Sequence, residues 1–189
     1  MNAPLARLSG GYAHPAHDSA RGFRAILNAM ARPGTSYGIA GAQGPAPISA
    51  AAATALLVLC DRTTPLYLAP SHDVAALRDW IAFHCAAPLV AAGDAAFALG
   101  DWAALQPVDR FAIGTAEYPD RAATLIVDHH DFDASAQVLR GPGIRDQARL
   151  ALPDADVFAA NHARFPLGWD TIFTAGDRIA ALPRSTEVG

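Results

Sequence analysis

The feature that most constrains the fold is the alternation of amphipathic helical segments with short apolar runs of strand length. Alternation of this kind favours parallel βαβ units, in which helices cover the faces of a sheet. The spacing of apolar residues predicts helices from Asp18 or Ser19 to Ala31 and over residues 49–60, 73–85 and 153–163. It predicts strands over residues 35–40, 65–70, 87–92, 95–100, 110–114, 123–129 and 136–141. We therefore expect an α/β fold.

The end of the chain departs from this alternation and has the pattern of an antiparallel hairpin. Apolar strand patterns stand on both sides of the turn residues Gly176-Asp177, between Trp169 and Pro183. A hairpin returns the chain to the level where it began, so residues 165–168 (FPLG) should approach residues 183–186 (PRST). Pro183 has no N–H to donate and should end the pairing. With parallel units early and a hairpin late, the fold class predicted is a three-layer α/β/α domain with a mixed sheet.

An arginine at the return point of a hairpin has two interpretations. Arg184 either pairs with Asp170 or Asp61, which would fix the edge of the sheet, or binds an anionic ligand or a partner protein. We expect the surrounding recess to contain Arg24 or His84 as well. The candidate ligand or partner site comprises Arg24, Asp61, His84, Phe165, Gly168, Asp170, Arg184 and Thr186.

Length and composition limit the class of protein. The 189 residues are enough for one domain with its own core, and the net charge of −4 argues against a nucleic-acid partner. The longest apolar run, residues 48–60, is too short to span a membrane, and the first residues lack the apolar segment of a signal peptide. We expect a cytoplasmic domain over residues 1–189, with residues 1–17 as a loosely ordered arm. Cys60 and Cys85 are then expected to be reduced thiols rather than a disulfide.

The chain contains no lysine, because all 14 of its basic side chains are arginine. A covalently held pyridoxal phosphate needs a Schiff-base lysine, and the phosphate-binding P-loop also needs a lysine. Both are therefore excluded, and we expect no cofactor. Any anion bound by this chain must be held by arginine, backbone N–H groups or hydroxyls, and the planar guanidinium group suits phosphate oxygens well.

Three local motifs carry reactive residue types but favour structural interpretations. Residues 128–131 (DHHD) have the side chains of a metal site, yet adjacent residues on a strand point to opposite faces, which favours a solvated loop and no metal. His84 lies on an apolar helix face, where a buried histidine is more common than a functional one, and Cys85 beside it points elsewhere. Residues 139–146 (LRGPGIRD) favour a tight turn over an anion-binding loop.

Six segments together carry a resemblance to a known family. They are, in chain order, GFRAILNAMARPG, LLVLCDRTTPLYL, FHCAAPLV, GTAEYPDRAATLIV, LRGPGI and FPLGWDTIFTAGDRIAALPRST. In order and spacing they resemble the PhnH family, the H subunit of the bacterial carbon–phosphorus lyase system. The resemblance covers nearly the whole chain, up to Val188. The DHHD motif has no counterpart in the family pattern, and the stretch after the first helix is unusually short and rich in glycine and proline.

The resemblance implies a fold similar to the large domain of pyridoxal-phosphate-dependent transferases, without the cofactor, and a homodimer. It also implies a place among the other subunits of the lyase core complex. With an ATP-binding-cassette-like partner, that complex joins an alkylphosphonate to C1 of the ribose of ATP and displaces adenine. The product is ribose 1-phosphonate 5-triphosphate.

Two classes of function remain open on the sequence. The first is a non-catalytic assembly subunit that contributes to a site for a phosphorylated small molecule. The second is a stand-alone enzyme acting on a sugar phosphate or nucleotide. In the second class, His84 would serve as acid or base, and Arg24 or Arg184 would clamp the anion.

Overall fold

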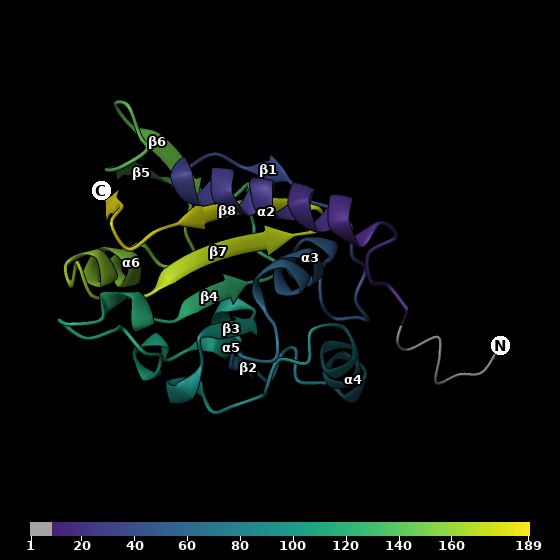
Figure 1. The fold of residues 1–189 in the computed structure, drawn as a ribbon. Coiled ribbons are helices and arrows are strands. Elements are labelled where there is room, and N and C mark those ends of the chain that lie inside the picture. The colour runs from purple at the N-terminus through teal and green to yellow at the C-terminus, as the bar shows by residue number, and fades with distance from the viewer. Residues whose placement is uncertain (1–8) are drawn as a thin grey trace.

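The computed structural model describes residues 9–189, which fold around a six-stranded sheet (Figure 1). Its strands are β1 (Tyr37–Gly38), β2 (Leu66–Leu68), β3 (Phe97–Gly100), β4 (Thr124–Val127), β7 (Asp170–Ala175) and β8 (Arg178–Leu182). The order across the sheet is β1-β8-β7-β4-β3-β2. β2, β3, β4 and β7 run parallel to one another, whereas β8 is antiparallel to β7 and β1 is antiparallel to β8. The prediction of an α/β fold with a mixed sheet is therefore confirmed.

Three helices cover one face of this sheet: α2 (Pro15–Ala31), α3 (Ala50–Leu59) and α4 (Ala75–His84). α3 begins at Ser49, whose side chain accepts the N–H of Ala52 at 3.1 Å as an N-cap. Its first half is buried on all sides because alanine lets neighbouring elements approach closely. Gly22 likewise allows α2 to pack closely against α3, since a Cβ at this position would lie 3.0 Å from methyl groups of Thr54 and Val58.

The other face of the sheet carries a second sheet and two short helices. The second sheet is antiparallel, with the order β6-β5-β9. Side chains alternate along the central strands, so Leu125 and Phe173 pack on this face while Ile126 and Ile172 pack against α2 and α3. The outer layer here is thus not purely helical, which differs from the expected α/β/α layering. Its elements are β5 (Ala136–Arg140), β6 (Ala148–Ala151), β9 (Glu187–Val188), α5 (Trp102–Leu105) and α6 (Ala155–His162).

Two of the predicted strands are wrong. In residues 87–92 only Leu89 forms a bridge, to Leu66, and in residues 110–114 only Ile113 forms one, to Ala122. The first segment lies beside β2 at the edge of the sheet, where Pro88 has no N–H to donate and a continuous ladder cannot form. β6, β9 and α5 were not predicted; single-turn 3₁₀ helices over Ala92–Asp94, Val108–Arg110 and Pro119–Arg121 complete the connections.

The start of the described chain also differs from the expectation of a loose arm. α2 begins at Pro15 rather than at residue 18 or 19, because proline is well suited to the first turn of a helix. The indole N–H of Trp80 donates to Ser9 O at 3.1 Å, and the Tyr12 hydroxyl donates to Thr54 O at the same distance. Residues 9–12 therefore contact the domain, residues 13–17 are exposed, and residues 1–8 lie outside the described residues. Within residues 9–189, no helix has the length and apolarity needed to cross a membrane.

Candidate functional site

The two ends of the β7–β8 hairpin meet at one edge of the main sheet, as predicted. The strands turn at Gly176-Asp177 and remain paired as far as Thr171 and Leu182. Arg184 follows the end of β8 and contacts the start of β7. Its backbone N–H donates to Asp170 Oδ1 at 2.8 Å, and its Nη1 donates to Gly168 O at 2.9 Å and lies 3.7 Å from Asp170 Oδ2. The predicted contact of Arg184 with Asp170 is confirmed, so its charge is neutralised within the chain.

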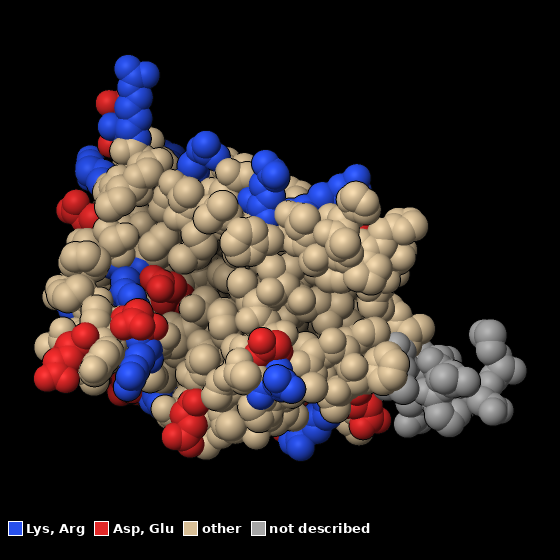
Figure 2. Space-filling view, viewed as in Figure 1, with Lys and Arg blue, Asp and Glu red and all other residues tan. Residues whose placement is uncertain are grey.

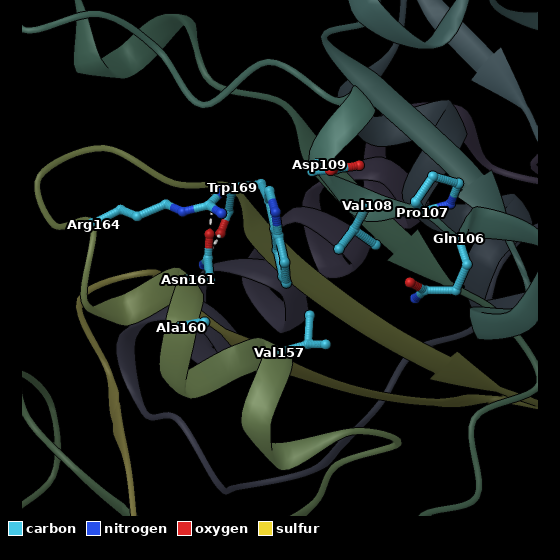
Figure 3. Close-up of a pocket in the computed structure, with 9 residues that line it drawn as sticks. All are labelled: Gln106, Pro107, Val108, Asp109, Val157, Ala160, Asn161, Arg164 and Trp169. Carbon is cyan, nitrogen blue, oxygen red and sulfur yellow. Dashed lines mark hydrogen bonds between the residues drawn. The ribbon is translucent and has the colours of Figure 1, made fainter.

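Helix α6 holds this corner in place through two side chains of its last turn. His162 Nδ1 donates to Arg184 O at 3.1 Å. The Asn161 side chain forms a reciprocal pair with the backbone of Trp169: Nδ2 donates to Trp169 O at 2.9 Å, and Oδ1 accepts the Trp169 N–H at 3.1 Å (Figure 3). Gly168 makes this approach possible, since it has a φ of +116° and a Cβ there would lie 2.7 Å from Asn161 Oδ1.

A cavity of about 250 Å³ opens beside this Asn161–Trp169 clamp. In Figure 3 the Trp169 ring stands in the middle, with Asn161 and Arg164 on one side and Val108 on the other. Among the lining residues Arg164 and Asp109 carry charge, and both side chains are exposed. Most of the described lining residues are apolar and a few are polar, as in sites that bind small molecules. The full lining is Gln106, Pro107, Val108, Asp109, Val157, Ala160, Asn161, Arg164 and Trp169.

The structure does not bring Arg24 or His84 to this corner, and that prediction is wrong. Arg24 is an exposed residue of α2. His84 ends α4, with its ring 4.8 Å from that of Trp80 and 4.9 Å from that of Phe83. It lines a different cavity, of about 230 Å³, together with Tyr12. α4 and α6 lie at opposite ends of the molecule in Figure 1; α4 follows β2 at the edge of the main sheet, whereas α6 follows β6 of the second sheet.

The remaining predicted site residues also have local roles. Asp61 accepts hydrogen bonds from Thr63 and Thr64 in the turn after α3, and the bonds from Thr63 hold the pKa of this carboxyl below its ordinary value. Phe165 is 58% exposed, whereas Thr186 is buried. The hydroxyl of Thr186 is thus not presented to solvent, which a ligand contact would require. Of the eight candidates, Arg184, Asp170 and Gly168 are in direct contact.

A second cluster, which sequence reasoning missed, surrounds Asp128 at the carboxyl end of β4. Both carboxylate oxygens are engaged: Oδ2 accepts the backbone N–H of Ser49 at 2.8 Å and lies 3.2 Å from His72 Nε2. Oδ1 accepts the Thr174 hydroxyl and the backbone N–H of His129, both at 2.9 Å. Burial raises the pKa of Asp128, but the hydrogen bonds from His72, Ser49 and His129 outweigh it, so the pKa lies below its ordinary value.

The hypothesis that residues 128–131 form a solvated loop is therefore wrong for two of the four. Asp128 is 1% exposed and His130 is 8% exposed. The His130 ring packs against Phe132 and Phe173, and burial lowers its pKa to about 4. His129 is exposed and points the other way, toward Pro47 O at 2.7 Å and over the Asp128 carboxylate. The two histidines diverge as predicted, but His129 meets His72 from another segment, with ring centres 5.5 Å apart.

The chain is similar in sequence to one protein family and to two named relatives. The sequence model of the family described as bacterial phosphonate metabolism protein (PhnH) matches residues 10–189. The chain belongs to the PhnH family. It is 37% identical, over 100% of its own length and 98% of the relative, to the alpha-D-ribose 1-methylphosphonate 5-triphosphate synthase subunit PhnH of Rhizobium meliloti strain 1021. It is also 32% identical to the putative C-P lyase subunit protein HtxG of Stutzerimonas stutzeri, over 40% of the chain and 42% of that relative.

In this PhnH-family chain the two clusters differ in chemistry. The cavity beside the Arg184–Asp170 corner has a mostly apolar lining, and the guanidinium group of Arg164 is exposed at its rim. These features suit the binding of a ligand or of a partner segment. The Asp128 cluster offers imidazole and carboxylate groups, which can hold a proton or a metal ion. Sequence reasoning missed His72, Asn161 and Trp169 as contributors. For His72 a signal was present, because it follows one predicted strand while Asp128 lies at the end of another, and the carboxyl ends of parallel strands share one edge.

Proposed function

We propose that this chain is the PhnH-type subunit of the bacterial machinery that forms ribose 1-phosphonate 5-triphosphate from ATP and an alkylphosphonate, in the carbon–phosphorus lyase pathway. The observation that carries the proposal is the match to the Rhizobium meliloti subunit across 98% of its length. A match of that extent relates the two as whole subunits rather than through one shared segment. The other subunits of the core complex are then its partners, and the cytoplasm is its place of action.

Within that complex we assign the chain an assembly or ligand-binding role without turnover of its own. The stand-alone enzyme would need His84 near Arg24 or Arg184. Instead, Arg184 is paired with Asp170, and His84 packs against Trp80 at the end of α4. Without His84 beside either arginine, the enzyme hypothesis loses the pairing of groups on which it depended.

The cavity beside Trp169 is our candidate contact for a phosphorylated ligand or a segment of a partner subunit. Arg164 is exposed at its rim, and no ion pair ties it to a carboxylate among those described for residues 9–189. A planar guanidinium at the rim of a largely apolar cavity suits the phosphate of a phosphorylated small molecule. Arg164→Gln should therefore weaken complex activity or assembly and leave the fold intact.

We further propose a homodimer with a fold related to pyridoxal-phosphate transferases, but without that cofactor. Phe23 and Leu27, one turn apart on α2, are 52% and 55% exposed, and a wide area below α2 carries no charged side chain (Figure 2). Apolar, charge-poor surface of this kind is typical of protein contacts. Light scattering should give twice the chain mass, and a monomeric mass would contradict the dimer. A visible aldimine band that borohydride removes would contradict the absence of the cofactor.

The central experiment compares the purified chain alone with the reconstituted complex, using ATP and methylphosphonate. Release of adenine and appearance of a new phosphonate ester in ³¹P spectra report the reaction. We expect no turnover by the chain alone and none by the complex without it, with activity restored on adding it back. Equal activity with and without the chain would refute the subunit role. Turnover by the lone chain, lost in His84→Ala, would instead favour the stand-alone enzyme.

A further inference from the structure

The cluster around Asp128 has the composition of a metal site. His72 follows β2, Asp128 follows β4, and His129 is the next residue, so the side chains come from two segments that meet at the carboxyl edge of the sheet. One ligand atom from each lies within 4.8 Å of the other two. Neither the family match nor the named relatives assign a metal to these residues. We propose that His72, Asp128 and His129 bind one divalent first-row transition-metal ion, with Zn²⁺ as the natural probe.

The distances fit such an ion after a small movement of one side chain. Metal–nitrogen and metal–oxygen bonds of about 2.1 Å place the ligand atoms of a tetrahedral ion about 3.4 Å apart. His72 Nε2 lies 3.2 Å from Asp128 Oδ2, and His129 Nε2 lies 3.8 Å from the same oxygen. The ligand atoms of the two histidines lie within 4.8 Å of each other, so they need to approach by at most about 1.4 Å. Because the side chain of His129 is 52% exposed, its ring can rotate away from Pro47 O to do so.

The surrounding hydrogen bonds orient the ligands as metal sites require. His72 Nδ1 lies 2.9 Å from Ser71 Oγ, which directs Nε2 of the same ring at Asp128. Ser71 Oγ in turn accepts the N–H of Asp101 at 3.1 Å, so the orienting group is itself fixed. Thr174 holds Oδ1 of Asp128. Partners of this kind, which set the tautomer and direction of a ligating histidine, accompany metal sites in general.

The backbone at His129 explains how two adjacent residues contribute to one site. His129 has a φ of +58°, in the left-handed region that residues with a Cβ rarely adopt. This conformation ends the alternation of β4 and turns the His129 ring back over Asp128. His72 and Asp128 are buried while His129 faces outward. Three protein ligands with one open side leave room for a water molecule, which is the arrangement of catalytic rather than structural zinc sites.

The test uses the full chain after treatment with EDTA, titrated with Zn²⁺ in a calorimeter and with Co²⁺ in an absorption spectrometer. We expect one Zn²⁺ per chain and the visible bands of four-coordinate Co²⁺ without a thiolate charge-transfer band, because no cysteine belongs to the cluster. His129→Ala should weaken Zn²⁺ binding at least tenfold. That side chain is exposed, so the variant should fold. Ser71→Ala should weaken binding about tenfold by freeing the His72 ring.

Two exposed histidines near the start of α2, His14 and His17, provide the matched control. The double variant His14→Ala/His17→Ala should bind Zn²⁺ with unchanged affinity. The proposal is overturned if the natural chain binds no Zn²⁺, or if His129→Ala binds it as tightly as the natural chain. It is also overturned if binding disappears in the His14/His17 variant, or if Co²⁺ shows a thiolate band. Asp128 would then serve only to tie β4, β7 and the start of α3 together.

Discussion

The Asn161–Trp169 clamp offers a direct test of how the candidate binding corner is built. Asn161→Ala removes both hydrogen bonds to the backbone of Trp169, a residue that is 1% exposed. Each lost bond costs about 1 kcal/mol net, and more where the abandoned group stays buried. The adjacent cavity gives water partial access to these groups, so we expect a total loss of about 2–3 kcal/mol in the free energy of unfolding.

Urea unfolding followed by tryptophan fluorescence measures this loss. With a denaturant dependence of about 2 kcal/mol per molar urea, the midpoint should fall by about 1–1.5 M. Asn161→Leu keeps most of the side-chain volume and should lose a similar amount, which separates hydrogen bonding from packing. Asp156→Ala, on an exposed position of the same helix, should change stability by no more than about 0.5 kcal/mol. An unchanged midpoint in Asn161→Ala would refute the argument that the clamp fixes the start of β7.

Two other predictions follow from the same structure. Arg184→Lys should lower the free energy of unfolding by about 1–2 kcal/mol, because an ammonium group cannot reach Gly168 O and Asp170 together. An unchanged midpoint of urea unfolding, with impaired activity of the complex, would instead indicate a ligand or partner role. Burial raises the pKa of Cys60 to about 12, whereas a thiol in the unfolded chain has a pKa near 8.5. The free energy of unfolding should therefore fall as the pH rises above about 8.5, by about 2 kcal/mol at pH 10. Cys60→Ala should be spared that loss, and an equal decline in both proteins would contradict it.

The parts of the fold that were predicted correctly are those with strong local signals. α2 stops at Arg32-Pro33, where proline cannot continue a helix, and the hairpin turns at Gly176-Asp177, where glycine adopts a φ of +56°. The parts that were missed depend on distant partners. β6 is a four-residue strand that contains Arg149, and β9 has two residues, so neither has a visible apolar alternation. Both exist because β5 lies between them, which no local pattern reveals.

The same distinction separates the two candidate sites. Contact between Arg184 and Asp170 follows from hairpin geometry alone, so it was predictable. The meeting of His72 with Asp128 depends on strand order: β3 lies between β2 and β4 in a parallel arrangement, and this places the ends of β2 and β4 at one edge. His129 and its sequence neighbour His130 diverge, as expected for adjacent residues at the end of a strand. In a parallel sheet, the relevant comparison is between residues that follow different strands. For this chain, that comparison selects His72 and Asp128, 56 residues apart.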